Sequence, residues 1–351
     1  MKKSGKIKRI ISLAVSIVLI ISSLTACAKS AAKAGEVSST PTAEGTELRT
    51  IRVAFMTGQP DHYAAVIGQE EGIYEKHGIK LEATEYAYGI NTIDAIANGT
   101  GDVGQCADFA GVNRIGNTLD YNQLVFYAEL SSINSTTGGV YVAPEYADDL
   151  SKLEDSAGWI TSIGTRTEYS NWYAQTALGL DPDKQKSVNT DSTATSLAAA
   201  QNGDASAVVA SGSQAKKYEE YGWKLVATSD QVSAKTGAYL VTSKPYIEAN
   251  ADILADYLAA LDESVKYIND HLDEVADRLS AKLGVDPENF KTDWKTPHIV
   301  IGFTEEGAQN LEDIAGWAAT HGKYEKPYNV RDFIITTAVE KAFPDRVTIK
   351  K

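Results

Sequence analysis

Short apolar strands alternate with helical segments along most of this chain, and no other sequence feature limits the accessible folds more. Residues 50–56, TIRVAFM, are mostly apolar or β-branched, which is typical of a buried strand. The break at 58–62 contains Gly and Pro, and residues 63–76 then carry apolar side chains at helical spacing. Because strands that alternate with helices build mainly parallel sheets covered by helices, the pattern predicts an α/β fold.

The same strand, turn and helix unit recurs further along the chain. Residues 79–87 alternate like a strand, and Asn91 is placed to cap a helix over 92–98 that precedes a short strand at 103–106. After Gly158 the unit appears again. There the sequence predicts strands at 160–163 and 207–210, a turn at 164–167, and helices at 169–178 and 193–201.

The C-terminal third is helical in pattern. Pro245 stands where a helix would begin, and apolar residues then recur at spacings of four and three. This stripe is compatible with a coiled coil. We favour two consecutive amphipathic helices that break at Asn269-Asp270, with Asp270 as the cap, and that end at Gly284. Further helices are expected over 304–320 and from Val330.

The N-terminal segment is typical of a secretory signal peptide, which we expect to span residues 1–26. A basic stretch without acids precedes a mostly apolar, uncharged run that is short for a membrane span. The run ends in LTAC, similar to the lipobox of bacterial lipoproteins, so Cys27 is the expected lipidation site. An uncleaved membrane anchor is the alternative. Residues 27–47 are then the anchor cysteine and a flexible tether, and the protein is expected to be extracytoplasmic and lipid-anchored to the cell membrane.

The net charge and the cysteine content argue against a nucleic-acid partner and against a disulfide framework. The chain carries a formal charge of −14, and loss of the five positive charges in the signal segment makes the mature chain more acidic still. Nucleic acid is therefore not an expected partner. Once Cys27 is lipidated, Cys106 is the remaining cysteine, so no intrachain disulfide is expected, and Cys106 should be a small buried apolar residue.

Several catalytic signatures fail on context. Residues 99–104 match GxGxxG but precede a strand instead of opening a helix. The SxxK of 213–216 and the KTG of 235–237 lie too close together for a penicillin-recognising serine enzyme, and no S-D-N lies between them. The histidines show no metal-ligand spacing. We therefore predict no enzyme, with no catalytic residues, metal or cofactor.

A set of short segments follows in a fixed order along residues 50–340. They are QEEGIYEKHGI at 69–79, IANGTGDVG at 96–104, AQNGDASA at 200–207, TGAYL at 236–240 followed by Pro245-Tyr246, and KPYNVR at 326–331. In this order, behind a lipobox, they resemble the ABC transporter substrate-binding proteins for sulfonates, nitrate, taurine and thiamine-pyrimidine precursors.

The resemblance implies a two-lobed periplasmic-binding-protein architecture, type II-like, in which each lobe is a mainly parallel sheet flanked by helices. Lobe 1 would comprise residues 48–137 and 238–351, and lobe 2 would comprise 138–237, with a ligand cleft between them. It also implies three kinds of partner, which are a small-molecule ligand, the permease and ATPase subunits of an importer, and the membrane through Cys27. The protein itself would be a monomer.

Topology and resemblance together select the candidate ligand-binding residues. In open α/β sheets, ligands bind at the carboxyl ends of strands, where helix N-termini favour anions. The candidates in the first lobe are Asp61, His62, Tyr88, Gly89, Asn91 and Asp108; those in the second are Arg166, Thr167, Glu168, Tyr169, Asn171, Ser211 and Ser213; the crossovers add Thr137 and Thr236. Asp108 is equally suited to cap the following helix.

These residue types point to a charged or zwitterionic ligand. Arg166 is suited to grip a carboxylate or sulfonate with two hydrogen bonds, and Asp108 and Glu168 favour an amine nearby. The prediction is a sulfonate, a taurine-like compound or another zwitterion. The alternative is an amino-pyrimidine or other aromatic heterocycle held by Tyr88, Tyr169 or Trp172, although Trp172 also suits core packing. Residues 210–212 lack the Trp-Asp-Pro of sulfonate binders.

Two other classes of protein remain open from the sequence. One is an enzyme of pyrimidine synthesis on the same fold, although the cysteine-rich motif of those relatives is absent. The other is a surface sensor that works without a transporter.

Overall fold

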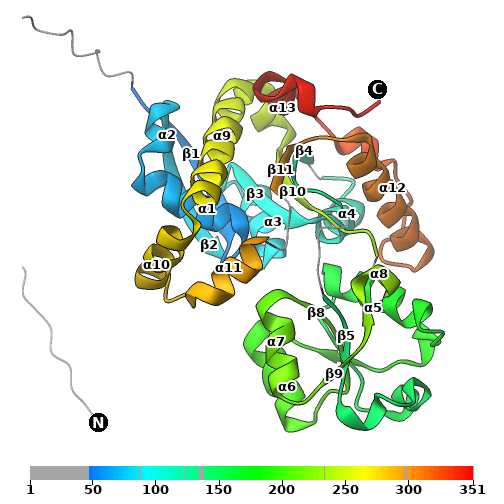
Figure 1. The fold of residues 1–351 in the computed structure, drawn as a ribbon. Helices are drawn as coiled ribbons and strands as arrows, with labels where there is room; N and C mark the ends of the chain where they lie inside the picture. Colours follow the sequence, from blue (N-terminus) through cyan, green and yellow to red (C-terminus); the bar gives the residue numbers. More distant parts are fainter. Residues whose placement is uncertain are drawn as a thin grey trace, which may run out of the picture. The chain divides into compact units, whose positions relative to one another are not determined.

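The computed structural model describes residues 47–86, 88–121, 123–133, 138–232, 234–295 and 299–350 (Figure 1). The predicted signal peptide, Cys27, most of the tether and Thr137 lie outside the described residues. The strands of the described chain form two separate sheets. Among these residues, no helix has both the length and the apolar character needed to cross a membrane.

The first sheet combines the early strands of the chain with two strands that return from its C-terminal third. Its strands lie in the order β2, β1, β3, β10, β4, β11. Strand β1 pairs in parallel with β2 and β3, whereas β10 is antiparallel to both β3 and β4. β1 to β4 therefore point the same way, and β10 and β11 run against them. The bounds are β1 Arg49–Met56, β2 Ile79–Tyr86, β3 Val103–Ala107, β4 Leu124–Ser131, β10 Ala238–Ser243 and β11 Ile299–Gly302.

The second sheet repeats this arrangement within the middle of the chain. Its strands lie in the order β7, β6, β8, β5, β9. The strands β7, β6 and β8 are parallel to one another, and β5 runs antiparallel to both of its neighbours, β8 and β9, as β10 does in the first sheet. The expected two-sheet α/β architecture is confirmed. Most strands of each sheet point the same way, but β10 and β11 run against them in the first sheet and β5 does so in the second. The bounds are β5 Gly138–Val142, β6 Trp159–Thr161, β7 Ser187–Asn189, β8 Ala207–Ser211 and β9 Lys224–Thr228.

Helices cover the faces of both sheets (Figure 1). In the first system α9 packs against α1 and α13, and α12 packs against α4. Their bounds are α1 Pro60–Glu70, α2 Ile73–Lys76, α3 Gly89–Ala97, α4 Asp108–Asn117, α9 Lys244–Asp270, α10 Leu272–Leu283, α11 Pro287–Lys295, α12 Glu305–Thr320 and α13 Thr337–Ala342. In the second system they are α5 Arg166–Ala177, α6 Thr193–Asn202, α7 Gly212–Glu220 and α8 Ser229–Val232. Short 3-10 turns span Pro144–Tyr146, Leu150–Asp155, Pro182–Lys184, Val330–Phe333 and Pro344–Arg346.

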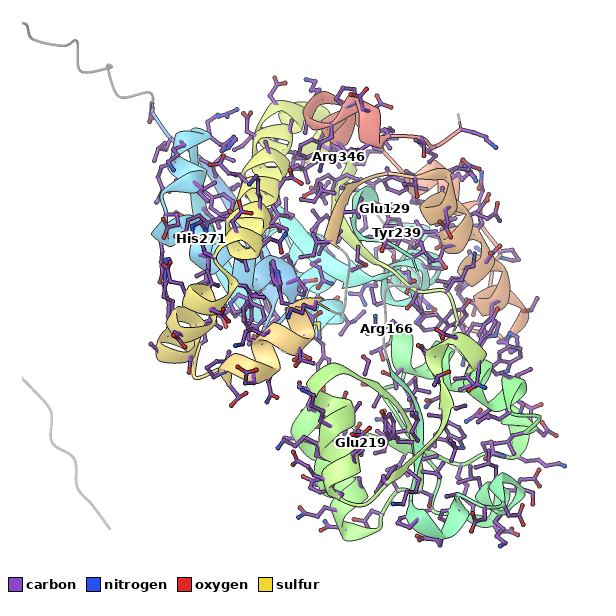
Figure 2. The ribbon with its side chains drawn as sticks, in the orientation of Figure 1. Glu129, Arg166, Glu219, Tyr239, His271 and Arg346 are labelled. Atoms are coloured by element: carbon purple, nitrogen blue, oxygen red, sulfur yellow. The ribbon has the colours of Figure 1, made fainter. Side chains whose placement is uncertain are left out.

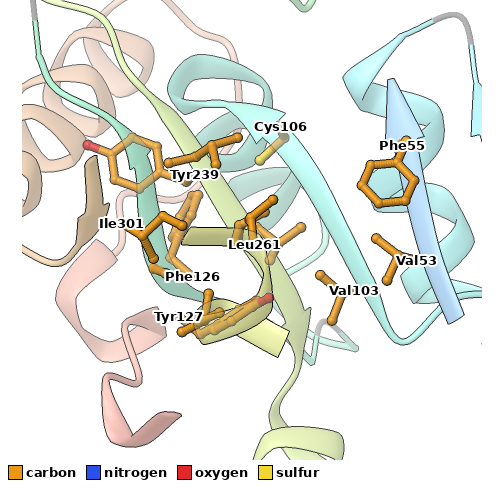
Figure 3. Packing of buried hydrophobic residues seen from close by; sticks show 14 of the residues in the cluster. Val53, Phe55, Val103, Cys106, Phe126, Tyr127, Tyr239, Leu261 and Ile301 are labelled. Atoms are coloured by element: carbon orange, nitrogen blue, oxygen red, sulfur yellow. The ribbon is translucent and has the colours of Figure 1, made fainter. Parts of the chain in front are cut away.

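The larger core lies on the first sheet (Figure 3). Phe55, Cys106, Phe126 and Tyr239 come from four different strands and are fully buried, and Leu261 of α9 packs into the same cluster. Cys106 is thus the buried apolar residue that the sequence predicted. The second sheet carries a smaller apolar cluster on each face, since Tyr141 belongs to one cluster and its neighbours Val140 and Val142 to the other.

Three predicted boundaries were wrong. The helix expected over 63–76 is two helices, because Gly72 adopts a left-handed conformation (φ +64°) between α1 and α2. The helix expected over 92–98 is α3, which begins at Gly89, so Asn91 lies inside it and Tyr88 is its N-cap residue. The turn expected over 164–167 is shorter, since α5 already begins at Arg166.

The long C-terminal stripe breaks close to the predicted place. It forms α9 and α10, and the residue between them is His271. Asp270 is the last residue of α9, where its carboxylate pairs with Lys266, and the N-cap position of α10 is occupied by His271 instead. Gly284 ends α10 in a left-handed conformation, as expected.

Candidate functional site

Two adjoining cavities lie where the carboxyl ends of several strands meet the starts of helices. One has a volume of about 120 Å³ and the other about 250 Å³. Both are lined by Arg166, Ser211, Gln214 and Thr236, so we treat them as one space and call it the cleft. The larger cavity also reaches residues of the first sheet system, including Gln59 at the start of α1. This is the position that sheet topology predicts for a ligand.

Arg166 is the basic side chain that lines both parts of the cleft. It is the first residue of α5 and is exposed (Figure 2). Thr165 caps the helix by accepting a hydrogen bond from the Thr167 backbone N–H at 3.3 Å, and this fixes the helix start that carries the arginine.

Arg166 differs from the other arginines of the described chain, because it makes no ion pair with a described carboxylate. The others are each paired with at least one Asp or Glu. They are Arg49, Arg52, Arg114, Arg278, Arg331 and Arg346. The cleft therefore contains a guanidinium whose hydrogen-bonding fork is available to an anion from solution.

Asp293 of α11 also lines the cleft and was missed by the sequence analysis. Its carboxylate accepts hydrogen bonds from the Ser213 backbone N–H at 2.8 Å and from the Ser213 hydroxyl at 2.7 Å. It thus closes the N-terminus of α7. Gly212 allows this approach: its φ is +58°, and a Cβ there would lie 2.3 Å from Asp293 Oδ1. No sequence signal links Asp293 to a turn that lies 80 residues earlier.

The structure brings some of the predicted residues to the cleft. Arg166, Thr167, Ser211 and Thr236 line it, and Ser213 contacts Asp293 at its edge. No aromatic side chain is found among the described residues that line the two cavities. The described lining of these cavities therefore offers no aromatic ring on which a heterocyclic ligand could stack.

Asp61 and His62 lie at the start of α1 but turn into the protein. They are 1% and 2% exposed. His62 Nδ1 accepts a hydrogen bond from the Gly58 N–H at 3.2 Å, and His62 Nε2 lies 3.3 Å from Glu85 Oε1. Burial raises the pKa of Asp61 to about 7. The cleft is instead reached by the preceding residues of the same turn, Gln59 and Pro60.

Asp108 joins three segments of the first sheet system. It is fully buried, and its carboxylate accepts hydrogen bonds from the N–H of Gly237 at 2.6 Å, from Asn310 Nδ2 at 2.9 Å and from the N–H of Phe109 at 2.7 Å. Burial raises its pKa, although these hydrogen bonds and the charge of Arg166 oppose the increase. Asp108 therefore ties the start of α4 to the return crossover and to α12, and it does not line the cleft.

Glu168, Tyr169 and Asn171 lie on the face of α5 that turns away from the cleft. Glu168 forms an ion pair with Lys323 and accepts a hydrogen bond from the Gly164 N–H at 2.8 Å. Tyr169 stacks on Phe109 at a centroid distance of 5.8 Å. Asn171 Nδ2 donates to the Ile160 carbonyl at 2.8 Å.

A separate crevice follows this outer face of α5 and reaches α12. It is lined in part by Glu168, Asn171, Trp172, Trp317 and Lys323. The ring centroids of Trp172 and Trp317 lie 5.7 Å apart, and both rings contact His321. Trp172 is thus packed among aromatic residues, as its core alternative predicted.

Tyr88, Gly89 and Asn91 lie at the start of α3. Gly89 packs on β3, since a Cβ there would lie 3.4 Å from Cys106 Cα. None of these three residues lines the cleft. A binding role for any of the predicted residues stays a prediction.

Solved structures with this fold include proteins named as binders of sulfonates and of nitrate. The periplasmic aliphatic sulphonate binding protein SsuA from Escherichia coli is 15% identical, with a TM-score of 0.69, over 82% of this chain and 92% of that one. The alkanesulfonate-binding protein SsuA from Xanthomonas axonopodis pv. citri, bound to MOPS, is 12% identical, with a TM-score of 0.67, over 82% and 98%. The periplasmic nitrate-binding protein NrtA from Synechocystis PCC 6803 is 14% identical, with a TM-score of 0.65, over 85% and 89%.

The chain therefore has the periplasmic-binding-protein fold, and the expected resemblance to the sulfonate and nitrate binders holds at the level of structure. No protein-family model matches the sequence, and no curated protein matches it. At these identities the likeness defines the fold alone.

Proposed function

We propose that this protein is the extracytoplasmic solute-binding component of an ABC importer and that it captures a small organic anion with Arg166. The observation that carries this proposal is the unpaired guanidinium in the cleft. The start of α5 adds the positive end of a helix dipole at the same place. Structurally similar proteins are named as binders of sulfonates and nitrate, which supports an anion.

The two sheet systems then act as two lobes, residues 48–137 with 238–351 and residues 138–237. Ligand binding draws the lobes together around the cleft, and the closed form is recognised by the permease and ATPase subunits of the importer. The monomeric protein performs no chemistry on its ligand.

Lipidation at Cys27 would hold the mature protein at the outer face of the cell membrane. Cells fed a labelled fatty acid should incorporate the label into the wild-type protein and not into Cys27→Ser. Labelling that persists in the variant, or that never occurs, contradicts the lipid anchor and leaves the binding function untouched.

A thermal-shift panel tests the binding function. Mature protein with Cys27→Ser is melted with alkanesulfonates, small carboxylates, nitrate, amino-pyrimidines and neutral sugars. A compound that binds only the folded state raises the melting temperature by mass action. We expect shifts with organic anions alone, and we expect Arg166→Ala to remove them.

Arg49→Ala is the matched control, because Arg49 is also exposed but is paired with Asp256. It should retain the shift. A shift that survives in Arg166→Ala, or a panel in which only neutral or heterocyclic compounds act, contradicts the proposal.

A further inference from the structure

Two opposite charges line the cleft without being neutralised. Arg166 and Asp293 are the charged side chains among the described residues that line the larger cavity. No ion pair joins them, and neither forms an ion pair with another described residue. The other described arginines are each paired, so this cavity is unusual in holding a cation and an anion that have no ion-pair partner among the described residues.

Asp293 has hydrogen-bonding capacity left for a ligand. A carboxylate offers about four acceptor positions. Ser213 uses two of them, through its N–H and its hydroxyl. Asp293 is partly buried, and its negative charge adds to burial in raising the pKa of Tyr63. A partly buried carboxylate without a counter-ion is stabilised when a cation enters its surroundings.

The same contact removes one anion position from the cleft. The free N–H groups at the start of α7 would otherwise attract a negatively charged ligand group. The carboxylate of Asp293 already accepts from the N–H of Ser213 there. A second negative charge on the ligand would meet Asp293, so the cleft has room for one anionic group, at Arg166.

We infer that Asp293 is the residue that selects the ligand, and that the ligand is a small zwitterion with its anionic group on Arg166 and a primary ammonium on Asp293. This inference rests on the proposed function, since it places the anion on Arg166. Arg166 and Asp293 line the same cavity but form no ion pair with each other, so the two charged groups of the ligand are joined by a spacer.

Matched ligand pairs test this inference. Titration calorimetry compares ω-amino-alkanesulfonates of two to four carbons with the ω-hydroxy compounds of the same length, and ω-amino carboxylates with ω-hydroxy carboxylates. The members of each pair differ only in the ammonium group. We expect the wild-type protein to prefer the amino member at least tenfold, and the sulfonate and carboxylate arms identify the anion.

Variants locate the preference on one side chain. Asp293→Asn loses the charge but keeps an acceptor oxygen for the Ser213 N–H, and its Nδ2 can donate to the Ser213 hydroxyl. It should therefore lower affinity for the amino compounds at least tenfold and leave the hydroxy compounds unchanged. Ser213→Ala should keep the amino preference, because it leaves the carboxylate in place. Asp273→Asn, an exposed carboxylate of α10, is the control for net charge and should also keep it.

The outcomes separate the two proposals. Equal binding of amino and hydroxy compounds by the wild-type protein, or an equal loss of both in Asp293→Asn, overturns the zwitterion and leaves the anion site standing. Failure of every anion to bind overturns the proposed function and this inference together. If Asp293→Asn does not fold, the wild-type comparison still decides the matter.

Discussion

The two faces of α5 differ in whether their charged side chains form ion pairs. On the face toward α12, Glu168 is paired with Lys323, and the rings of Tyr169 and Trp317 pack beside this pair. On the cleft face, Arg166 makes no ion pair with a described residue. Burial of polar and aromatic groups on one face supplies rigidity, whereas an unpaired charge on the other gives no stability to the free protein. The difference indicates that the outer face holds the helix in place, and under the proposed function the cleft face binds the ligand.

The largest expected effect comes from the structural face. The Trp317 ring is 8% exposed and contacts Phe109, Tyr169 and His321. Trp317→Ala should lower the free energy of unfolding by about 3–5 kcal/mol, because it leaves a large cavity. Urea denaturation measures this loss, and Trp317→Phe should lose less. A loss below about 1 kcal/mol contradicts a structural role for this cluster.

The second effect concerns Asp61, a buried carboxyl group that the fold holds in its protonated, uncharged form without an ion-pair partner. Burial raises the pKa of Asp61 from 3.8 to about 7, so between these values the folded protein binds more protons than the unfolded chain. The free energy of unfolding should therefore fall as pH rises from about 4 to 7, by up to about 4 kcal/mol at about 1.4 kcal/mol per pKa unit. Denaturation at a series of pH values measures the slope.

Asp61→Asn should flatten that slope, and Asp273→Asn should not. Glu129, whose pKa burial also raises to about 7, leaves a residual slope in the Asp61 variant. A variant slope as steep as that of the wild type would show that Asp61 is already ionised in the folded protein.

The third effect separates binding from stability. Arg166→Ala should weaken binding of the best anion about 100-fold, equivalent to about 2.7 kcal/mol, because a bidentate charged contact is lost. Its free energy of unfolding should change by less than about 0.5 kcal/mol, since the side chain has no described ion pair. Calorimetry and urea denaturation of the same preparation give both numbers. A large loss of stability with little loss of affinity would reverse the roles of the two faces.

The smallest effect concerns the paired charge on the outer face. Lys323→Ala should cost about 1 kcal/mol of stability, because the ion pair with Glu168 is only partly buried, and should leave ligand affinity unchanged. A double-mutant cycle with Glu168→Gln isolates the interaction. A change in affinity in Lys323→Ala would extend the binding region beyond the cleft.

Sequence reasoning worked where the fold depends on local pattern. Strand and helix periodicity located most elements, because each period reflects a single buried face. The rule that ligands lie at strand ends selected the loop of Arg166 from the sequence alone. It could not show that Asp61 and His62 turn inward, because that depends on where α1 begins, and the helix starts at Pro60.

Long-range pairing was the part that sequence could not supply. β10 enters the first sheet between β3 and β4 although more than 100 residues separate it from either. Asp293 reaches Ser213 across 80 residues, and only the packing of α11 on α7 brings them together. Neither contact has a local signature, so the second charge of the cleft was missed.

The most direct test is a crystal structure of the protein with the tightest-binding anion from the thermal-shift panel. The account predicts that the anionic group lies within hydrogen-bonding distance of the Arg166 guanidinium, inside the cleft. A ligand bound in the crevice beside Trp172 and Lys323, with Arg166 untouched, would contradict it.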